Sequence, residues 1–497
     1  MGANGGAMVW DSAALKEAVH AKIGEHKFIA VSNREPYVHR YGPKGIVCER
    51  PVSGMAVALD PVLQACGGIW VAHGSGEADR EVVDPQSHIA VPPGKYAYTL
   101  RRVWLTPEEE QGYYYGFSNE ALWPLCHIAF TQPVFRQADW EAYRRVNEKF
   151  AEAVLEEMGT DTGFVFIQDY HFTLLPRILK KRRPELVVAQ FWHIPWPNRE
   201  AFRVCPWGEE ILDGLLGNDL LGFHIRNHCQ NFLDTVDRGI EARVDHERSS
   251  VTRGGLETVV RPFPISIDFA LVDKMAGCGE TSARAAQLRA EHGLNGMKVG
   301  IGIDRMDYIK GIPERLLAVD RFFEKYPEYR GRFVFLQLGP GSRTEIQTYK
   351  DYNATIEKLA AEVNKKHSTA DWQPVLLHRG HLPPEEVTAY YRLADLCLVS
   401  SLHDGMNLVA KEYVAARGDG EGGLVLSHFT GAARELEQAV LVNPYATDEL
   451  AEALKLALEM PAEEKSKRME RMRETVHENN IYSWAGKIIT ELNRRLV

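Results

Sequence analysis

The fold is decided by one stretch of the sequence, Leu396-Cys-Leu-Val-Ser400 followed by Ser401-Leu-His-Asp-Gly-Met-Asn-Leu-Val-Ala-Lys-Glu-Tyr413. The apolar run 396–400 is typical of a buried parallel strand. The residues after Asn407 have helix-forming character, so the glycine-containing segment between the two predicts a turn that enters a helix. A strand, a turn and a helix start in this order indicate an α/β fold.

The turn also has the features of an anion-binding site. Helix N-termini carry unpaired N–H groups and a partial positive charge, which favour phosphate groups. Asp404 opens the turn, and Glu412 follows about two helical turns later. Because amides suit phosphates and carboxylates suit hydroxyl groups, the turn predicts a site for a sugar nucleotide.

Length and composition indicate a multidomain globular protein. The chain has 497 residues, of which 45% are hydrophobic and 25% are charged. Its net charge of −10 argues against general nucleic-acid binding. No apolar run reaches the roughly 18–20 residues of a membrane span, and the N-terminus lacks the pattern of a signal peptide. The seven cysteines are scattered, which fits reduced thiols. We therefore expect a cytoplasmic protein without nucleic-acid or membrane partners, and a homo-oligomer is left open.

Two series of strands alternating with helices predict an α/β protein of two doubly wound, Rossmann-like domains that face a cleft. The strands expected in the first series are 27–32, 68–72, 164–168, 187–192 and 220–224. Those expected in the second series are 298–303, 333–338, 375–378, 396–399, 423–427 and 439–442. Ligands of such sheets bind outside the carboxyl ends of the strands, where we therefore expect the site.

The joint between the two series is Val260-Arg-Pro-Phe-Pro-Ile-Ser-Ile-Asp268, whose prolines disfavour both helix and strand. We expect an N-terminal extension over 1–26, a first domain over 27–264 and a second domain over 265–475. The last stretch, 476–497, reads as a helix that packs back on the first domain, with Trp484 as its apolar anchor.

Cations follow two expected strands of the second domain. Arg305 and Lys310 come directly after the strand 298–303, and Arg343 lies in a Gly/Pro loop after the strand 333–338. Such cations suit a diphosphate, because charge-assisted hydrogen bonds are strong. The alternative is that Arg305 and Lys310 form surface salt bridges with the carboxylates in the same run, and that Arg343 is a solvated turn residue.

Polar residues also end strands in the first domain. Arg34 ends the first strand, Asp169 follows another strand, and His193 follows the next. Asp169 and His193 therefore belong on one edge of the sheet, where they could grip sugar hydroxyls or move a proton. The turn Ser53-Gly54 could present amides to a phosphate, although short turns of this kind are common.

The stretch Tyr113-Tyr-Tyr-Gly-Phe-Ser-Asn-Glu-Ala-Leu-Trp-Pro124 is dense in aromatic residues, which are equally suited to core packing and to ligand contact. No two aspartates are separated by one position, so the D-x-D pattern of metal-dependent sugar transferases is absent, and so is a GxxxxGK[ST] loop. We therefore expect neither a metal nor a cofactor.

With these motifs, the chain resembles the trehalose-6-phosphate synthases, which are retaining glycosyltransferases with the two-domain GT-B fold. The resemblance runs from about Phe28 to Trp484. The motifs that carry it occur in the family order and are VSNR, YGFSNEALWP, QDYH, HIPWP, DRMDYIKGIPER and DGMNLVAKEY. Several motifs in order are far more specific than any one of them.

The resemblance implies roles for individual residues. Arg305 and Lys310 would hold the donor diphosphate, and the amides of Leu408 and Val409 would contact its phosphates. Glu412 would bind the ribose, and Asp404 and His193 would orient the glucose, with Asp169 near the reacting centre. The rest of the donor site would be Ser53, Gly54, Gly405, Met406 and Asn407. The acceptor pocket and its phosphate site would be Arg34, Tyr114, Trp123 and Arg343, together with Asp169.

The activity implied is the transfer of glucose from UDP-glucose, or from ADP- or GDP-glucose, to glucose 6-phosphate. The product would be α,α-trehalose 6-phosphate, and the leaving phosphate oxygen would take the proton of the incoming hydroxyl on the same face of the sugar. The chain also departs from the family pattern at positions that bear on the choice of donor and, to a lesser extent, on the acceptor. Ser53 stands where glycine is usual, Gln168 where histidine is usual and His403 where arginine is usual, and the loop 35–52 is longer than in bacterial synthases.

Three alternatives remain open from the sequence. The nearest is a transferase with another phosphorylated acceptor, such as glycerol 3-phosphate in glucosylglycerol-phosphate synthesis. Another is a catalytically silent binding or regulatory protein of the same fold, and the last is a nucleotide-sugar epimerase of GT-B fold. The residues of the acceptor pocket argue against all three.

Overall fold

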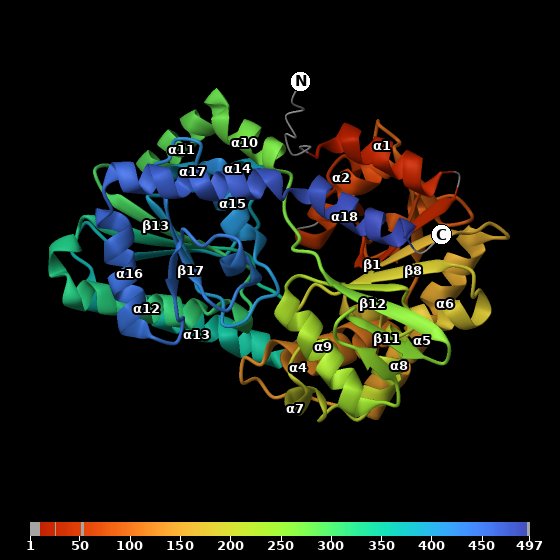
Figure 1. The fold of residues 1–497 in the computed structure, drawn as a ribbon. Helices are drawn as coiled ribbons and strands as arrows, with labels where there is room; N and C mark the ends of the chain where they lie inside the picture. The colour runs from red at the N-terminus through yellow and green to blue at the C-terminus, as the bar shows by residue number, and fades with distance from the viewer. Residues whose placement is uncertain (1–9, 25, 51–53, 495–497) are drawn as a thin grey trace, which may run out of the picture. The chain divides into compact units, whose positions relative to one another are not determined.

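The computed structural model describes residues 10–24, 26–50 and 54–494. The chain forms two compact units (Figure 1). The first unit comprises Met1–Ile265 together with Asn480–Val497, and the second comprises Ser266–Asn479. The chain therefore returns to the first unit at Asn480 rather than at residue 476.

The first unit contains a ten-stranded sheet in the order β10-β11-β12-β9-β8-β7-β1-β4-β6-β5. Its strands are β1 (Lys27–Arg34), β4 (Ile69–His73), β5 (His88–Val91), β6 (Tyr98–Val103), β7 (Gly163–Gln168), β8 (Val187–Phe191), β9 (Leu220–Phe223), β10 (Arg243–Asp245), β11 (Ser250–Arg253) and β12 (Leu256–Pro262). The strands from β12 to β6 pair in parallel, and antiparallel strands lie at both edges. All five strands expected from the first series are present, as β1, β4, β7, β8 and β9.

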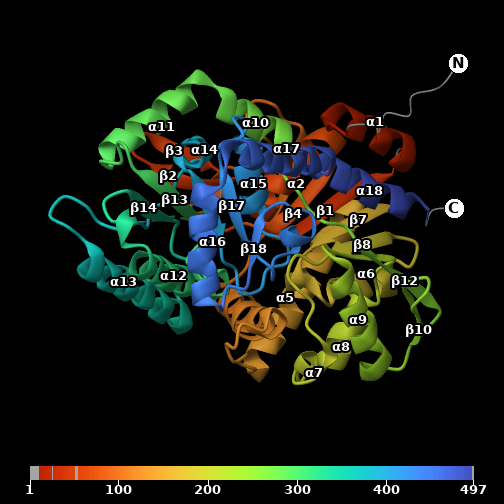
Figure 2. The ribbon, with the colours of Figure 1, turned by 60° about the vertical axis from the view of Figure 1, so that its left-hand side comes forward.

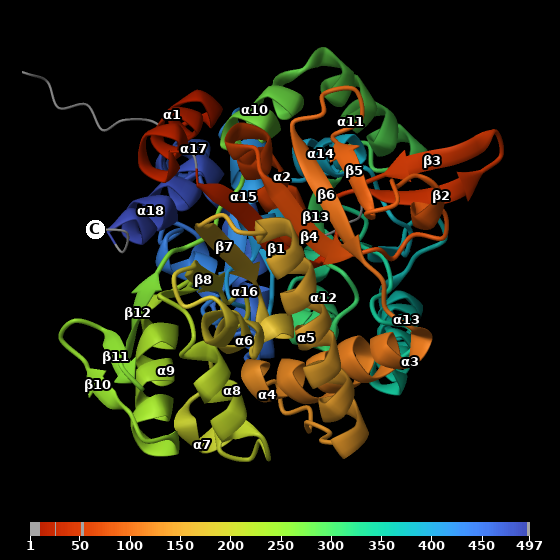
Figure 3. The same cartoon turned by 90° about the vertical axis from the view of Figure 1, so that its right-hand side faces the viewer.

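Helices cover both faces of this sheet (Figures 1 and 3). One face carries α1 (Ser12–Ile23), α2 (Gly54–Cys66) and α18 (Ile481–Asn493). The other carries α5 (Gln137–Met158), α6 (Leu175–Arg182), α8 (Gly208–Leu215) and α9 (Arg226–Gly239). Trp484 of α18 packs against Phe166 of β7 and Phe191 of β8, with ring centroids 5.9 and 5.1 Å away. An apolar anchor thus holds the C-terminal helix on the first sheet.

The short elements of the first unit lie in its connections. They are β2 (Val38–Gly42), β3 (Gly45–Glu49), η1 (Asp79–Glu81), α3 (Pro107–Glu110), the π-helix η2 (Gln111–Leu122), α4 (Trp123–His127), η3 (Tyr170–Phe172) and α7 (Arg199–Phe202). The long loop expected at 35–52 contains the hairpin β2–β3. Every residue of β3 is exposed, so this strand lacks the alternation of buried and exposed residues by which strands are found in a sequence.

The proline-containing joint begins later than the sequence indicates. Val260, Arg261 and Pro262 continue β12, which pairs with β9 as far as Pro262. The expectation that prolines break this whole segment was therefore wrong for its first residues. Pro262 lies beyond the pairing of β12 with β11, which ends at Val259, so its missing N–H removes no bond between these two strands.

The second unit contains a six-stranded, fully parallel sheet in the order β15-β14-β13-β16-β17-β18. Its strands are β13 (Lys298–Ile303), β14 (Phe333–Leu338), β15 (Val375–His378), β16 (Leu396–Val399), β17 (Gly423–Ser427) and β18 (Val440–Val442). All six strands expected from the second series are present.

Helices also cover both faces of the second sheet, as Figure 2 shows. One face carries α12 (Ile312–Lys325), α13 (Gln347–His367) and α16 (Thr447–Glu459). The other carries α10 (Phe269–Gly277), α11 (Gly279–Glu291), α14 (Pro384–Leu393), α15 (Leu408–Ala416) and α17 (Ala462–Glu478). The 3-10 turns η4 (Tyr308–Lys310), η5 (Pro327–Tyr329) and η6 (Gly431–Arg434) lie in the loops. Both units are therefore doubly wound.

A fully buried arginine, Arg315 of α12, ties together the carboxyl ends of three neighbouring strands. Its Nη2 donates to Asp304 Oδ2 at 2.7 Å, directly after β13. Its Nη1 donates to Gln337 Oε1 in β14 at 2.8 Å, and its Nε donates to Ser400 Oγ after β16 at 3.0 Å. Because a buried charge is tolerated only when it is paired and hydrogen-bonded, these contacts fix the three strand ends relative to one another.

We expect Gly302→Ala to lower the free energy of unfolding by about 1–3 kcal/mol, the usual cost of overpacking a core. An added Cβ would lie 2.1 Å from Arg315 Nη1, which its hydrogen bonds hold in place. Urea unfolding measures the difference. Gly279→Ala at the start of α11 is the matched control, because nothing lies within 4 Å of its added Cβ. Equal stability of the two variants would contradict a rigid arginine brace.

Candidate functional site

The predicted residues of the second unit gather at the carboxyl ends of its sheet. Arg305 follows β13, Lys310 ends η4, and the turn 401–407 connects β16 to α15. Because β14, β13 and β16 are neighbours in the sheet, the loops that follow them leave from one edge. This edge is where ligands bind in doubly wound folds.

An ion pair joins two of these loops. Lys310 Nζ lies 2.6 Å from Asp404 Oδ2. The same oxygen accepts hydrogen bonds from Ser401 Oγ at 3.3 Å and from Asn407 Nδ2 at 3.2 Å. Burial disfavours the charge of Lys310, but the Asp404 carboxylate holds the pKa of this lysine above its usual value. The site therefore holds a cation and a carboxylate side by side.

The alternative, in which these cations form surface salt bridges with carboxylates of the same run, is only partly met. Lys310 pairs with none of the carboxylates in its own run but with Asp404, 94 residues further along the chain. Arg305 Nη1 donates to Ser342 Oγ at 3.2 Å, and its Nη2 lies 3.9 Å from Asp307 Oδ2. Asp307 is one of the carboxylates of that run, and it contacts both Arg305 and Arg343 at this edge.

The start of α15 has the geometry of an anion site. Asn407 caps the helix, and its side chain accepts from the amide of Ala410 at 3.1 Å. The amides of Leu408 and Val409 are the first in the helix and so have no intrahelical acceptor. A helix N-terminus beside Lys310 presents donors and positive charge together.

Backbone contacts hold the turn in place. Asp404 N donates to Phe429 O at 3.0 Å, and Ala432 N donates to Met406 O at 2.9 Å. A Cβ on Gly431 would lie 2.0 Å from Gly405 O, so only glycine fits there. Gly405 and Met406 are therefore buried parts of the turn that shape its backbone.

Glu412 lies on α15, and its Oε2 accepts a hydrogen bond from Tyr391 Oη at 2.9 Å. Burial raises the pKa of Glu412, while the hydrogen bond from Tyr391 opposes this rise. Tyr391 comes from α14, 21 residues earlier. No motif in the sequence links the two positions.

Arg343 belongs to the second unit. Its Nη1 lies 2.7 Å from Asp307 Oδ2 and also contacts Tyr349 Oη at 2.5 Å. The other predicted acceptor residues, Arg34, Tyr114 and Trp123, belong to the first unit. Their grouping with Arg343 stays a prediction.

The predicted residues of the first unit also lie at strand ends. Asp169 follows β7 and His193 follows β8, which are paired neighbours. Asp169 Oδ1 accepts from the amides of Tyr170 at 3.0 Å and His193 at 3.2 Å. The expected meeting of Asp169 and His193 on one edge of the sheet is thus observed.

The departure at Gln168 has a structural consequence. Its Oε1 lies 2.9 Å from His193 Nε2, which fits donation by the imidazole N–H. Burial lowers the pKa of His193 to about 3. This histidine is therefore neutral near pH 7 and acts as a hydrogen-bonding group rather than a cation.

Three predicted residues adopt unusual backbone conformations. Asp169 has φ 72° and ψ 177°, a region that is essentially confined to glycine. Arg343 has φ 45° and Asn407 has φ 82°. Because such strain persists only where the surrounding structure enforces it, its presence at these three positions supports a functional role.

The aromatic stretch forms the π-helix η2, whose i→i+5 bonding is rare and often marks functional sites. Tyr113 and Phe117 are fully buried, so part of the stretch is core. Tyr114 Oη instead accepts from Arg34 Nη2 at 2.8 Å. Trp123 follows directly and packs 5.8 Å from the Tyr170 ring. Part of the stretch is thus core, and ligand contact by Tyr114 and Trp123 stays a prediction.

The remaining donor predictions are less informative. Ser53 lies outside the described residues, and Gly54 is the exposed first residue of α2. Over the described ranges, no group of three or more His, Cys, Asp or Glu side chains is arranged to hold a metal ion. All seven cysteines are free thiols.

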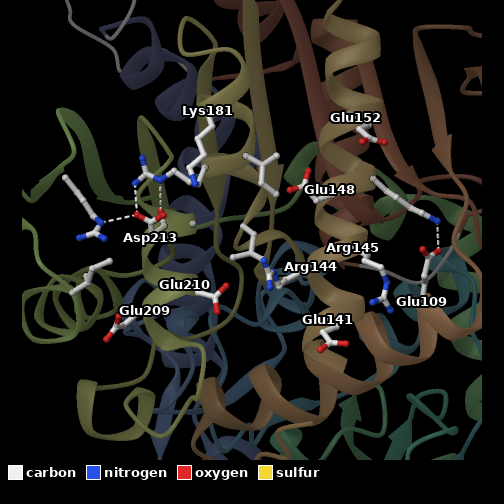
Figure 4. Close-up of a pocket in the computed structure, with 17 residues that line it drawn as sticks. Glu109, Glu141, Arg144, Arg145, Glu148, Glu152, Lys181, Glu209, Glu210 and Asp213 are labelled. Atoms are coloured by element: carbon white, nitrogen blue, oxygen red, sulfur yellow. Dashed lines mark hydrogen bonds and ion pairs between the residues drawn. The ribbon is translucent and has the colours of Figure 1, made fainter. Parts of the chain in front are cut away.

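The first unit also contains a groove of about 900 Å³, which lies apart from the predicted site residues. Figure 4 shows side chains of α5 facing those of α6 and α8 across it. Its charged lining consists of Glu109, Glu141, Arg144, Arg145, Glu148, Lys149, Glu152, Arg177, Lys181, Glu209, Glu210, Asp213 and Arg253. None of the residues predicted from the sequence is among them, and the two signs of charge are mixed.

Comparisons with known proteins agree with this geometry. The model of glycosyltransferase family 20 matches residues 26–494. The trehalose-6-phosphate synthase of Mycolicibacterium vanbaalenii is 38% identical over 482 residues, covering 95% of this chain and 97% of that protein. The chain belongs to glycosyltransferase family 20.

Solved structures are similar over nearly the whole chain. A trehalose-6-phosphate protein from E. coli bound with UDP-2-fluoro glucose has a TM-score of 0.84 at 33% identity, covering 94% of this chain and 99% of that one. The α,α-trehalose-phosphate synthase (UDP-forming) of Burkholderia xenovorans in complex with glucose-6-phosphate has a TM-score of 0.84 at 30% identity, covering 94% and 100%.

These comparisons confirm the resemblance drawn from the motifs. They also confirm the fold class, two Rossmann-like units of the GT-B type, and that the protein is an enzyme of a glycosyltransferase family. None of the helices in the described part of the chain is long and apolar enough to cross a membrane.

We expect Asp169→Gly to reduce glycosyl transfer at least about tenfold while leaving stability near that of the wild type. Glycine relieves a backbone strain of about 1–3 kcal/mol, which offsets the two lost hydrogen bonds. Steady-state turnover and urea unfolding measure the two effects. Ser249→Gly is the control, because Ser249 also has positive φ, 49°, but lies in the β10–β11 connection. It should stabilise the fold and leave turnover unchanged.

Proposed function

We propose that the protein is a trehalose-6-phosphate synthase that transfers glucose from UDP-glucose to glucose 6-phosphate with retention of the anomeric configuration. The products are α,α-trehalose 6-phosphate and UDP. The observation that carries the proposal is the contact of Lys310 with Asp404 beside the N-terminus of α15. The lysine and the helix amides can bind the diphosphate, and the Asp404 carboxylate can accept hydrogen bonds from the glucose hydroxyls.

The second unit binds the donor in this proposal. Arg305, Lys310 and the amides of Leu408 and Val409 hold the diphosphate, and Glu412 accepts the ribose hydroxyls. Asp404 exchanges its contact with Lys310 for the glucose hydroxyls when the diphosphate draws the lysine away. The complex of the E. coli protein with UDP-2-fluoro glucose supports the uridine donor.

The first unit supplies groups for the acceptor. The guanidinium of Arg34, which donates a hydrogen bond to Tyr114 of η2, suits a sugar phosphate. Trp123 follows η2 directly, as the first residue of α4. Asp169 and the neutral His193 offer hydrogen bonds to sugar hydroxyls. The complex of the B. xenovorans protein with glucose-6-phosphate supports this acceptor.

Retention follows from substitution on one face of the sugar. The bond from the anomeric carbon to the β-phosphate oxygen breaks as a bond to the acceptor oxygen forms. The departing phosphate oxygen takes the acceptor's proton, and Arg305, Lys310 and the helix amides stabilise its charge. The protein then acts by positioning and electrostatics, so we propose that it needs neither metal nor cofactor.

The free thiols support a location in the cytoplasm.

We expect Arg305→Ala and Lys310→Ala each to lower turnover at least about tenfold, because more than ~1.4 kcal/mol of transition-state stabilisation is lost. Steady-state rates at saturating substrates measure the loss. Lys298→Ala is the matched control, since it removes an exposed ion pair with Asp395 at the other end of β13. Near-normal turnover in both site variants would contradict the donor assignment.

An assay of all substrate pairs tests the reaction itself. UDP-, ADP- and GDP-glucose are each incubated with glucose 6-phosphate or glycerol 3-phosphate, and the products are identified by mass spectrometry and by the NMR coupling of the anomeric protons. We expect trehalose 6-phosphate, fastest with UDP-glucose. A product formed only from glycerol 3-phosphate would establish the alternative acceptor. Nucleotide release that acceptors do not stimulate would refute a synthase.

A further inference from the structure

Tyr391 lies behind the carboxylate that the proposed function assigns to the ribose. It is 1% exposed, and its hydroxyl donates to Glu412 Oε2 at 2.9 Å. Glu412 projects from the second turn of α15, whose first amides are assigned to the phosphates. The contact therefore joins the tyrosine to the donor half of the site without placing it on the ligand.

The tyrosine itself is held firmly. Its backbone carbonyl accepts from Arg417 Nη1 at 3.0 Å, and the same nitrogen donates to Arg392 O and Ala394 O. Its ring meets that of Tyr413 edge to face, with centroids 5.9 Å apart. A rigid donor fixes the orientation of the group that it contacts.

Glu412 is left with free acceptor capacity. Among the described residues, the hydrogen bond from Tyr391 to Oε2 is the only one that the Glu412 side chain makes. A carboxylate can accept about four hydrogen bonds, so Oε1 and the second lone pair of Oε2 remain for a ligand. Two neighbouring hydroxyl groups match two carboxylate oxygens held in one plane.

We infer that Tyr391 is a positioning residue that aligns the Glu412 carboxylate with the vicinal hydroxyls of the donor ribose. It thereby sets the preference of the enzyme for ribonucleotide over deoxyribonucleotide donors. The inference rests on the proposed donor site. Without the tyrosine, Glu412 is free to rotate, and its charged form also loses a stabilising hydrogen bond.

Tyr391→Phe tests the inference by removing a single oxygen atom. We expect the KM for UDP-glucose to rise about three- to tenfold and kcat to stay within about twofold. The ratio of kcat/KM for UDP-glucose over 2′-deoxy-UDP-glucose should fall by a similar factor, and the KM for the acceptor should not change. A merely structural role would not alter this ratio.

Tyr413→Phe is the matched control, because the Tyr413 hydroxyl is equally buried on the next helix and finds no hydrogen-bond partner in the part of the chain that the structure describes. It should leave the KM for UDP-glucose and the ratio unchanged. Thermal unfolding of both variants shows whether Tyr391→Phe folds normally. The double variant Tyr391→Phe/Glu412→Gln should lose no more discrimination than Glu412→Gln, because the tyrosine acts through the carboxylate.

Two failures can be told apart. If Glu412→Gln abolishes the ribose preference but Tyr391→Phe retains it, the positioning role is wrong and the proposed donor site stands. If an active Glu412→Gln enzyme retains the full preference, the assignment of Glu412 to the ribose is wrong as well.

Discussion

The second unit depends on the burial of one charge, the guanidinium of Arg315. Each of its three nitrogens meets an oxygen at the end of a different strand, so none of its charge is left unpaired. Ser400 Oγ in turn lies within hydrogen-bond distance of the carbonyls of Lys310 and Gly311, so the loop after β13 is restrained as well. The loops that carry Arg305, Lys310 and the turn 401–407 therefore begin from fixed points. A buried ion pair is weak evidence for stability, but it strongly disfavours any arrangement that breaks it.

The first unit uses the same physical device beside its own strand ends. Arg102 is fully buried, and it contacts Glu35 Oε2 and Asp79 Oδ1 at 2.8 Å each. Burial raises the pKa of Glu35 to about 8 although Arg102 opposes this rise. Since Glu35 also accepts from the amide of Ser75 at 2.8 Å, the backbone after Arg34 is anchored from several directions. Strand ends in each unit are thus braced by a buried arginine: Arg315, which ends the motif DRMDYIKGIPER, and Arg102, which lies outside the motifs.

Several site contacts could be foreseen because parallel sheets place the carboxyl ends of their strands at one edge. Asp169 and His193 follow adjacent strands, and their meeting needed only the correct order of β7 and β8. The contact of Tyr391 with Glu412 could not be foreseen, because it depends on how α14 packs against α15. The positive φ of Asp169 could not be foreseen either, because no glycine stands at this position to indicate it. Neither the π-helix nor the exposed strand β3 has a periodicity that distinguishes it.

The sequence by itself determined the class of fold, the strands of both parallel series and the family to which the chain belongs. Apolar runs and turn residues are local signals, and family motifs are read directly from residue order. Only the tertiary structure decided which charges meet, such as Lys310 with Asp404 and Arg343 with Asp307. Such pairs depend on the whole fold. A charge that is removed from water pairs with the opposite charge that packing brings close to it, regardless of the distance between the two residues along the chain.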